Sequence, residues 1–74
     1  MYMIHMKLSA RNQIKGKVVK VTHGMVNSEI TIDIGGGQQI VSVITKTSAE
    51  SLGLAVGKEV YAVIKSSEIM VAVD

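Results

Sequence analysis

Three consecutive glycines, Gly35–Gly37, separate two runs that are rich in β-branched residues. In the first run, Glu29–Ile34, isoleucine alternates with polar residues, which is the pattern of a strand buried on one face. The second run, Gln38–Thr45, carries apolar residues on both of its faces. Because glycine adopts positive φ readily, a glycine turn between two such runs predicts a β-hairpin.

The remaining segments favour further strands and one short helix. Gly16 interrupts the first strand, which predicts a bulge or a sharp bend. We expect a loop over 23–28 and a helix over 47–53, which Thr47 or Ser48 caps and Gly53 ends. The pattern is that of an all-β, five-stranded OB-like barrel with one short helix. Its strands are expected at Lys7–Val21, Glu29–Ile34, Gln38–Thr45, Glu59–Lys65 and Glu68–Val73.

The length of 74 residues leaves room for a single small domain. We place this domain at residues 6–74, with residues 1–5 as a candidate disordered N-terminal extension. A domain of this size is marginally stable alone, and the absence of cysteine excludes disulfides and thiolate metal sites. The two histidines, His5 and His23, are too few for a metal cluster. Several strands carry apolar residues on both faces, which indicates burial in an oligomer.

Several classes of function are disfavoured by what the chain lacks. No cysteine is available as a nucleophile, neither histidine stands in a recognisable triad, and the carboxylates are scattered, so we expect no enzyme. The net charge of +2 suggests anionic partners. A single arginine and 3% aromatic residues argue against nucleic acid. No membrane span or secretory leader is recognisable, so we expect a cytoplasmic protein.

Three polar clusters interrupt the apolar β-sequence: Ser9–Asn12, Thr45–Ser48 and Lys65–Ser67. Together they supply hydroxyls, backbone N–H groups, a guanidinium and ammonium groups, and the helix start adds partial positive charge. A tetrahedral dianion presents only acceptors, so this donor set suits it. The same residues also serve as ordinary caps, turns and surface charges, and composition alone leaves both interpretations open.

Four blocks of sequence resemble the molbindin (Mop) family, in the same order and over about Met6 to Val73. The blocks are Ser9–Val18, Val26–Ile30, Ile44–Leu54 and Gly57–Ile69. The resemblance implies an OB-like barrel that binds molybdate or tungstate without catalysis and without a cofactor. It also implies a homo-oligomer, a hexamer built as a trimer of dimers, in which N-terminal strands are exchanged within each dimer.

The resemblance also implies two kinds of site. A second-type oxyanion site near the threefold axis corresponds to Val26, Asn27 and Ser28. No metal ion is expected apart from the metal of the oxyanion itself. The main oxyanion site, at subunit interfaces, corresponds to Ser9, Ala10, Arg11, Thr45, Ser48, Lys65, Ser66 and Ser67.

The function that the resemblance implies is intracellular binding and storage of molybdate or tungstate. Two alternatives remain at this point. One is a small OB-type nucleic-acid-binding protein, which the pI of about 9.1 favours. The other is a module that binds an intact molybdopterin, which would need a larger apolar cleft.

Overall fold

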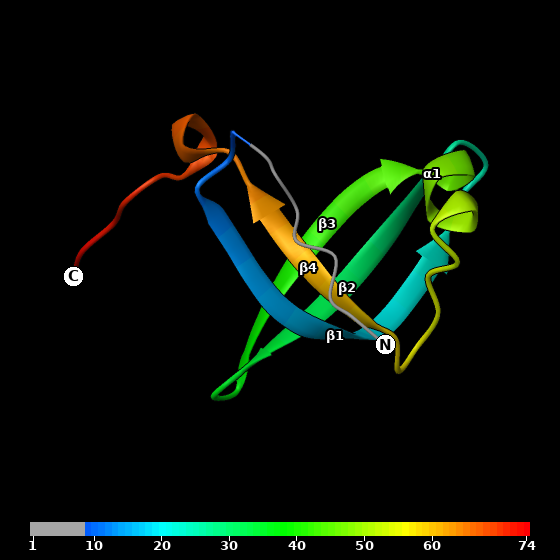
Figure 1. Ribbon diagram of the computed structural model, residues 1–74, viewed down its shortest axis with the longest axis horizontal. Helices are drawn as coiled ribbons and strands as arrows, with labels where there is room; N and C mark the ends of the chain where they lie inside the picture. The colour runs from blue at the N-terminus through cyan, green and yellow to red at the C-terminus, as the bar shows by residue number, and fades with distance from the viewer. Residues whose placement is uncertain (1–8) are drawn as a thin grey trace.

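The computed structural model describes residues 9–74 (Figure 1). A six-residue helix, α1 (Lys46–Ser51), separates the third and fourth strands, and a 3₁₀ helix, η1 (Ser66–Glu68), follows the fourth. The expected extension at residues 1–5 and the beginning of the first expected strand lie outside the described residues. The strands are β1 (Asn12–His23), β2 (Asn27–Gly35), β3 (Gln38–Thr45) and β4 (Glu59–Ile64).

Within residues 9–74 the strands form one antiparallel sheet in the order β3-β2-β1-β4. The long strand β1 is shared between two neighbours. Its first half pairs with β4, from Asn12 opposite Ile64, and its second half pairs with β2, up to His23 opposite Ser28. The sheet therefore curls as a partly open barrel, in which β3 and β4 are the edge strands and diverge toward their C-terminal ends (Figure 1).

Gly16 lies beside Lys17, where β1 changes partners, and the expected bulge is not at Gly16. The register shift lies between Val18 and Lys20 instead. At Gly16 a Cβ atom would lie 2.6 Å from Ile32 Cγ2 and 2.7 Å from the Asp33 carbonyl oxygen. Glycine is required because β1 lies too close to β2 at this point for any side chain.

The expected hairpin between the second and third strands is confirmed. Gly36 and Gly37 have φ of +63° and +78°, which suits the type I′ turn of a two-residue hairpin. Asp33 Oδ1 accepts a hydrogen bond of 2.8 Å from the Gly35 N–H just before the turn. The glycines are thus a turn and not a phosphate cradle.

The expected helix is present, but its start is different. Thr45 is the N-cap, not Thr47 or Ser48, because its Oγ1 accepts the Ser48 N–H at 3.1 Å. The expected stop at Gly53 is confirmed, with φ of +64°. The N–H groups of Gly53 and Leu54 bond to the carbonyls of Glu50 and Ala49, which is the Schellman pattern.

The expected fifth strand, Glu68–Val73, is wrong for this chain. Glu68 ends η1, its N–H bonding to the Lys65 carbonyl at 2.9 Å, and the residues after it belong to no strand. Figure 1 shows this tail leading away from the sheet. Alternating apolar residues mark a face that needs covering, but the alternation does not specify which chain supplies the cover.

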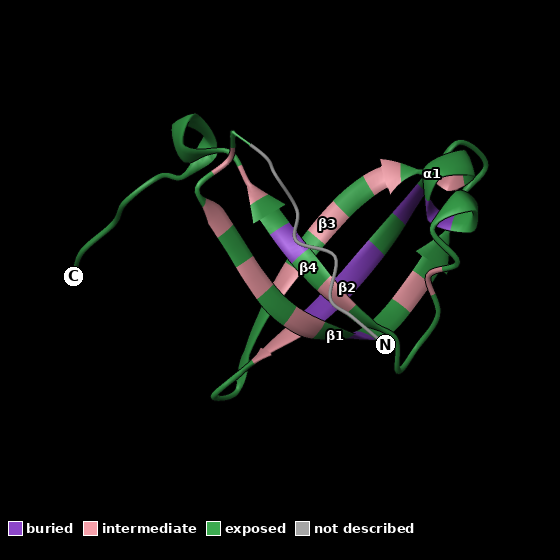
Figure 2. Cartoon of the chain, in the orientation of Figure 1, coloured by how far each residue is buried: buried purple, intermediate pink, exposed green. Residues whose placement is uncertain are grey.

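The core lies on the concave side of the sheet, as Figure 2 shows along β2. Ile30 and Ile32 are buried as the alternation predicted, while Val41 and Val43 on the opposite face of β3 are 57% and 62% exposed. Neither helix in residues 9–74 has the length and apolarity needed to cross a membrane. In that same part of the chain the buried apolar residues are Val18, Ile30, Ile32, Ala49 and Ala62.

Candidate functional site

The first and third polar clusters meet at one end of the sheet. Antiparallel pairing sets the start of β1 beside the end of β4, with Asn12 opposite Ile64. Residues 9–11 therefore enter β1 where residues 65–67 leave β4. Asn12 Nδ2 donates to Ser66 Oγ at 3.5 Å, and Gln13 Nε2 donates to the Ala10 carbonyl at 3.1 Å. The Asn12–Ser66 contact joins the segment that carries Arg11 to the turn that carries Lys65, and the Gln13–Ala10 contact is local to the first segment.

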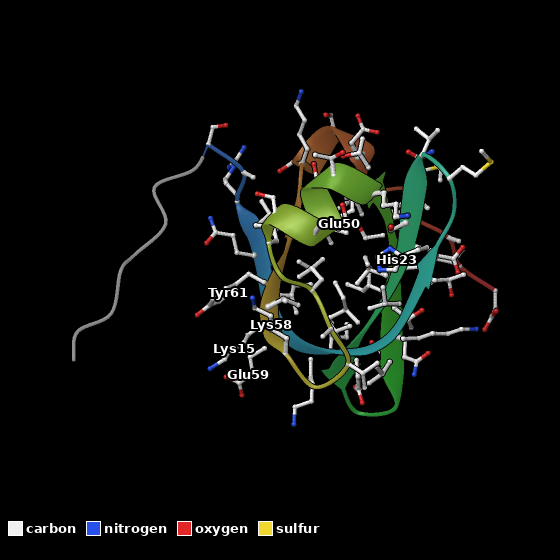
Figure 3. The ribbon with its side chains drawn as sticks, turned by 90° about the vertical axis from the view of Figure 1, so that its right-hand side faces the viewer. Lys15, His23, Glu50, Lys58, Glu59 and Tyr61 are labelled. Carbon is white, nitrogen blue, oxygen red and sulfur yellow. The ribbon has the colours of Figure 1, made fainter. Side chains whose placement is uncertain are left out.

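Arg11 and Lys65 carry positive charge without a carboxylate partner in the described residues. Within residues 9–74 the ion pair present is Lys15 with Glu59, at 3.6 Å and with both side chains mostly exposed (Figure 3). Glu59 therefore pairs with Lys15 and not with Arg11 or Lys65. Arg11 and Lys65 place two exposed cations at this end of the sheet, and Glu68 in η1 is a carboxylate three residues after Lys65.

The second cluster is built around two hydroxyls at the junction of β3 and α1. Thr45 Oγ1 donates to Ser48 Oγ at 2.7 Å while it accepts the Ser48 N–H at 3.1 Å. Both side chains are exposed. Because α1 has only six residues, its dipole is small, and the hydroxyls carry the donor chemistry of this cluster.

A single copy does not bring the three clusters together. β3 and β4 leave the sheet from its two edges, so α1 and η1 lie on opposite sides of the barrel opening (Figure 1). The structure thus joins Ser9, Ala10 and Arg11 with Lys65, Ser66 and Ser67, and separately joins Thr45 with Ser48. The candidate donors therefore form two separate groups, which we call half-shells.

The expected second-type site takes a different local form from the predicted loop. The loop is shorter, because His23 ends β1 and Asn27 begins β2. Ser28 is 1% exposed, and its Oγ lies 2.6 Å from His23 Nδ1. The Val26 carbonyl accepts the Lys46 N–H at 2.8 Å, which ties this loop to the start of α1. The Ser28 hydroxyl is therefore committed to His23, while Val26 and Asn27 stay exposed.

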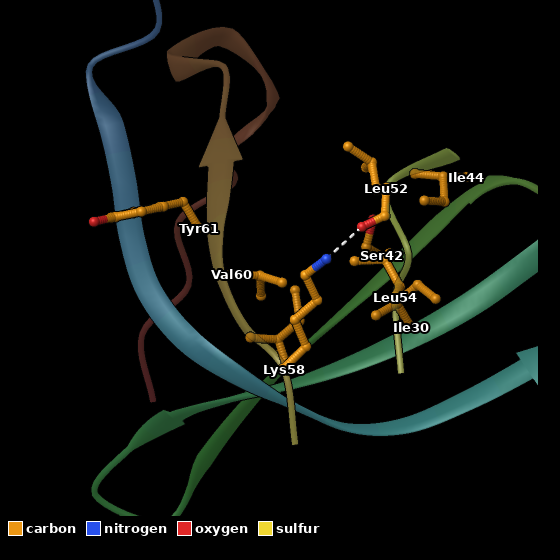
Figure 4. Close-up of a pocket in the computed structure, with 9 residues that line it drawn as sticks. Ile30, Ser42, Ile44, Leu52, Leu54, Lys58, Val60 and Tyr61 are labelled. Atoms are coloured by element: carbon orange, nitrogen blue, oxygen red, sulfur yellow. Dashed lines mark hydrogen bonds between the residues drawn. The ribbon is translucent and has the colours of Figure 1, made fainter. Parts of the chain in front are cut away.

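Sequence reasoning missed two features. His23 was expected only as part of the loop over 23–28, whereas the structure pairs this exposed residue with the buried Ser28. The signal available was a histidine and a serine flanking a short glycine-containing turn. Sequence reasoning also missed an apolar groove of about 390 Å³ between β3 and β4, across which Lys58 Nζ donates to the Leu52 carbonyl at 2.6 Å (Figure 4). The groove is lined by Ile30, Ile32, Ser42, Ile44, Leu52, Leu54, Lys58, Val60 and Tyr61.

The chemistry of both donor groups is the same. Hydroxyls, a guanidinium, an ammonium and backbone N–H groups all donate hydrogen bonds, so they suit a ligand made of acceptors. Within residues 9–74 no three histidine or acidic side chains gather as metal ligands. A small oxyanion is the class of ligand that this donor set recognises best.

Comparison with known proteins places the chain among molybdenum proteins. The TOBE domain model matches residues 8–71. A probable molybdenum-pterin-binding protein of Haemophilus influenzae is 51% identical over 69 residues, which is 93% of this chain and all of that protein. Its name describes a binding protein and not an enzyme.

Two solved structures are similar in fold and in sequence. MopII from Clostridium pasteurianum superposes with a TM-score of 0.85 at 45% identity, covering 90% of this chain and all of that one. The molybdate-binding protein ModG, described as cytoplasmic and solved with molybdate bound, superposes with a TM-score of 0.79 at 52% identity. That match covers 82% of this chain and 43% of ModG.

Proposed function

The chain belongs to the TOBE domain family, within its molbindin (Mop) group, and we propose that it binds molybdate or tungstate at sites formed between copies of a homo-oligomer. The binding is non-catalytic and serves storage and homeostasis of the oxyanion in the cytoplasm. The names of the H. influenzae relative and of ModG, which concern molybdenum and molybdate, support this choice of ligand.

The separation of the donor groups is the observation that carries the proposal. One group follows the β1–β4 pairing, and the other stands at the start of α1 on the far side of the barrel opening. A tetrahedral anion presents acceptors in all directions, so two half-shells surround it better than one. In one copy the half-shells lie on opposite sides of the barrel opening (Figure 1), so we infer that two copies complete a site.

The two cations of the first half-shell match the charge of the proposed ligand. A dianion carries two negative charges, which Arg11 and Lys65 offset. The guanidinium binds two oxygens through its planar fork, whereas the ammonium acts as a compact point charge. Ser9, Ser66, Ser67 and the Ala10 N–H lie in the same half-shell, and Thr45 and Ser48 donate from the other.

We also propose the second-type site, but without the Ser28 hydroxyl as a donor. We assign it to Val26 and Asn27, with Ser28 contributing through its main chain only. The Ser28 hydroxyl is buried against His23 and is not free to face an anion.

A homo-oligomer, in the arrangement of a trimer of dimers with exchanged N-terminal strands, is the assembly that we propose. The small buried core supports association, because a domain of this size is marginal without added burial. The exposed valines on the outer face of β3 supply apolar surface for it.

Calorimetric titration of the full chain with molybdate tests the proposal, with sulfate as control and the mass followed by native mass spectrometry. We expect strong molybdate binding by an oligomer and weak sulfate binding. A folded protein that gives no heat with either molybdate or tungstate contradicts it.

An intact molybdenum-pterin is the second candidate, because the H. influenzae relative carries that ligand in its name. A pterin ring needs an apolar cleft beside its polar contacts. The structure has an apolar groove between β3 and β4, but the donor residues of the two half-shells lie outside its lining and are mostly exposed, which favours the free oxyanion. Titration with the isolated pterin cofactor distinguishes the two: heat with the cofactor and none with molybdate selects the second candidate.

A further inference from the structure

Asn12 differs from its two neighbours at the start of β1. Arg11 and Gln13 are exposed, whereas Asn12 is half-buried and lies opposite Ile64 of β4. Two residues after Ile64 the chain reaches Ser66 in η1, at the same end of the sheet as the start of β1 (Figure 1). The register therefore brings the Asn12 amide near this serine, and Asn12 Nδ2 lies 3.5 Å from Ser66 Oγ. Asn12 thus contacts a proposed oxyanion donor without belonging to the donor set itself.

The contact between these two side chains has a fixed direction. An amide nitrogen donates hydrogen bonds and has no lone pair to accept one, so the Ser66 oxygen is the acceptor. The Ser66 hydroxyl proton then points elsewhere, and within residues 9–74 it is donated to no other protein group. Ser66 is exposed, at the end of the sheet that carries Arg11 and Lys65. Its proton is therefore available to a ligand that binds beside these two cations.

The other half-shell has the same arrangement of donor and acceptor. Thr45 Oγ1 donates to Ser48 Oγ at 2.7 Å, so the Ser48 oxygen accepts within the protein and the Ser48 proton stays free. In each half-shell one serine oxygen thus accepts from a neighbouring side chain, Asn12 in one and Thr45 in the other. A hydroxyl polarised in this way is a better donor, because successive hydrogen bonds strengthen one another.

We propose, on the premise that the half-shells bind an oxyanion, that Asn12 is a positioning residue. It holds the Ser66 oxygen as an acceptor, so that the Ser66 proton points to the anion. The distance of 3.5 Å is longer than that of an ordinary N–H···O hydrogen bond. We expect anion binding to shorten it, since an anion that draws on the Ser66 proton makes the Ser66 oxygen a stronger acceptor.

A hydroxyl held in this direction distinguishes oxyanions by their protons. Molybdate and sulfate carry no proton near neutral pH, whereas inorganic phosphate at mildly alkaline pH is mainly hydrogen phosphate, a dianion with one O–H group. That O–H group needs an acceptor, and Ser66 held by Asn12 presents a donor instead. Asn12→Asp reverses this polarity, because a carboxylate only accepts and takes the Ser66 proton for itself. The Ser66 oxygen then offers a lone pair to the O–H group of hydrogen phosphate.

A double-mutant cycle on molybdate affinity tests the action of Asn12 through Ser66. The variants are Asn12→Ala, Ser66→Ala and the two together, titrated calorimetrically with molybdate beside the wild-type chain. We expect Asn12→Ala to raise the molybdate Kd about threefold to tenfold in the wild-type chain, and by less than about twofold when Ser66→Ala is already present. A structural role of Asn12 in β1 would persist without the Ser66 hydroxyl. Gln39→Ala, which removes an exposed amide on β3, is the matched control and keeps the wild-type Kd.

Competition between two ions of similar size and charge supplies an independent arm. Sulfate and phosphate are each used to displace molybdate at mildly alkaline pH, and the ratio of their inhibition constants is compared between variants. Asn12→Asp adds a negative charge that acts on both dianions alike, so the ratio reports the direction of the Ser66 hydroxyl. We expect Asn12→Asp to shift this ratio at least about threefold toward phosphate. Gln13→Glu adds the same charge one residue along β1 and leaves the ratio within about twofold of the wild-type value.

Three results overturn the role of Asn12. They are an Asn12→Ala variant with the wild-type Kd, equal losses from Asn12→Ala with and without the Ser66 hydroxyl, and an Asn12→Asp variant that keeps the wild-type ratio or binds no phosphate. Each leaves the oxyanion site in place. A wild-type chain that gives no heat with molybdate or tungstate refutes the proposed function instead, so the two failures are distinguishable.

Discussion

Thr45 Oγ1 donates to Ser48 Oγ at 2.7 Å and accepts the Ser48 N–H at 3.1 Å, so one threonine both caps α1 and satisfies a neighbouring hydroxyl. The two hydroxyls bond to each other. Under the proposed function, an oxyanion offers both protons a stronger, charged acceptor. Thr45 then serves both stability and binding, and mutation separates the two roles.

Thr45→Ala removes the cap and one donor together. Loss of an N-cap side chain costs about 1 kcal/mol of stability, so we expect a melting temperature lower by about 4–8 °C together with weaker molybdate binding. Ser48→Ala removes a donor but leaves the cap and weakens binding alone. Differential scanning calorimetry and molybdate titration of both variants check the split, with Thr45→Ser as the control that keeps both roles. Unchanged stability of Thr45→Ala would show that the cap is not needed.

Arg11→Ala and Lys65→Ala weaken molybdate binding more than Ser67→Ala does. A hydrogen bond to a charged partner is worth about 1.5–3 kcal/mol, which corresponds to about a tenfold to a hundredfold change in Kd. Lys20→Ala is the matched control, since it removes one exposed positive charge outside the donor groups. Equal Kd values for Arg11→Ala, Lys65→Ala and Lys20→Ala would remove these cations from the site.

Gly16→Ala destabilises the fold although it adds a single methyl group. Its Cβ would lie 2.6 Å from Ile32 Cγ2 and 2.7 Å from the Asp33 carbonyl oxygen, and main chain cannot move aside cheaply. Overpacking of this kind costs about 1–3 kcal/mol. Urea denaturation measures the loss, and Lys17→Ala, an exposed neighbour on the same strand, is the control. A Gly16→Ala variant as stable as the control would contradict the close crossing of β1 over β2.

His23→Leu costs more stability than Ser28→Ala. Without the imidazole, the Ser28 hydroxyl, in a residue 1% exposed, loses its partner, and an unpaired buried polar group costs about 1–3 kcal/mol. Without the hydroxyl, the exposed imidazole bonds to water instead. Thermal denaturation of both single variants and of the double variant tests this, and the double variant is expected to recover part of the His23→Leu loss. The reverse order of the two single variants would contradict the buried pairing.

The local parts of the fold follow from the sequence. Alternation in β2 and the glycine turn are properties of adjacent residues, and Ile30, Ile32 and Gly36 behave as such patterns require. The helix start was misplaced because Thr45, Thr47 and Ser48 are all good caps. The choice among them depends on the Lys46 N–H bond to the Val26 carbonyl, a contact distant in sequence.

The non-local parts were not predictable in the same way. The alternation after Glu68 indicates a face that needs a partner, but it contains no information about whether that partner is the same chain or another. The groove exists because β3 and β4 are the two edges of one sheet, a property of the whole topology. Motif chemistry likewise proposed the donors, but it did not show that Thr45 and Arg11 lie on opposite sides of the barrel opening (Figure 1).

The most direct test of a site shared between copies is a mixing experiment with two inactive variants. Arg11→Ala disables one half-shell, and Thr45→Ala with Ser48→Ala disables the other. If each site combines the Arg11 half-shell of one copy with the Thr45 half-shell of another, random mixed oligomers regain about one intact site in four. Molybdate titration of the exchanged mixture is then expected to recover about that share of the wild-type stoichiometry at wild-type affinity. A mixture that binds no better than the two variants measured apart would contradict the account.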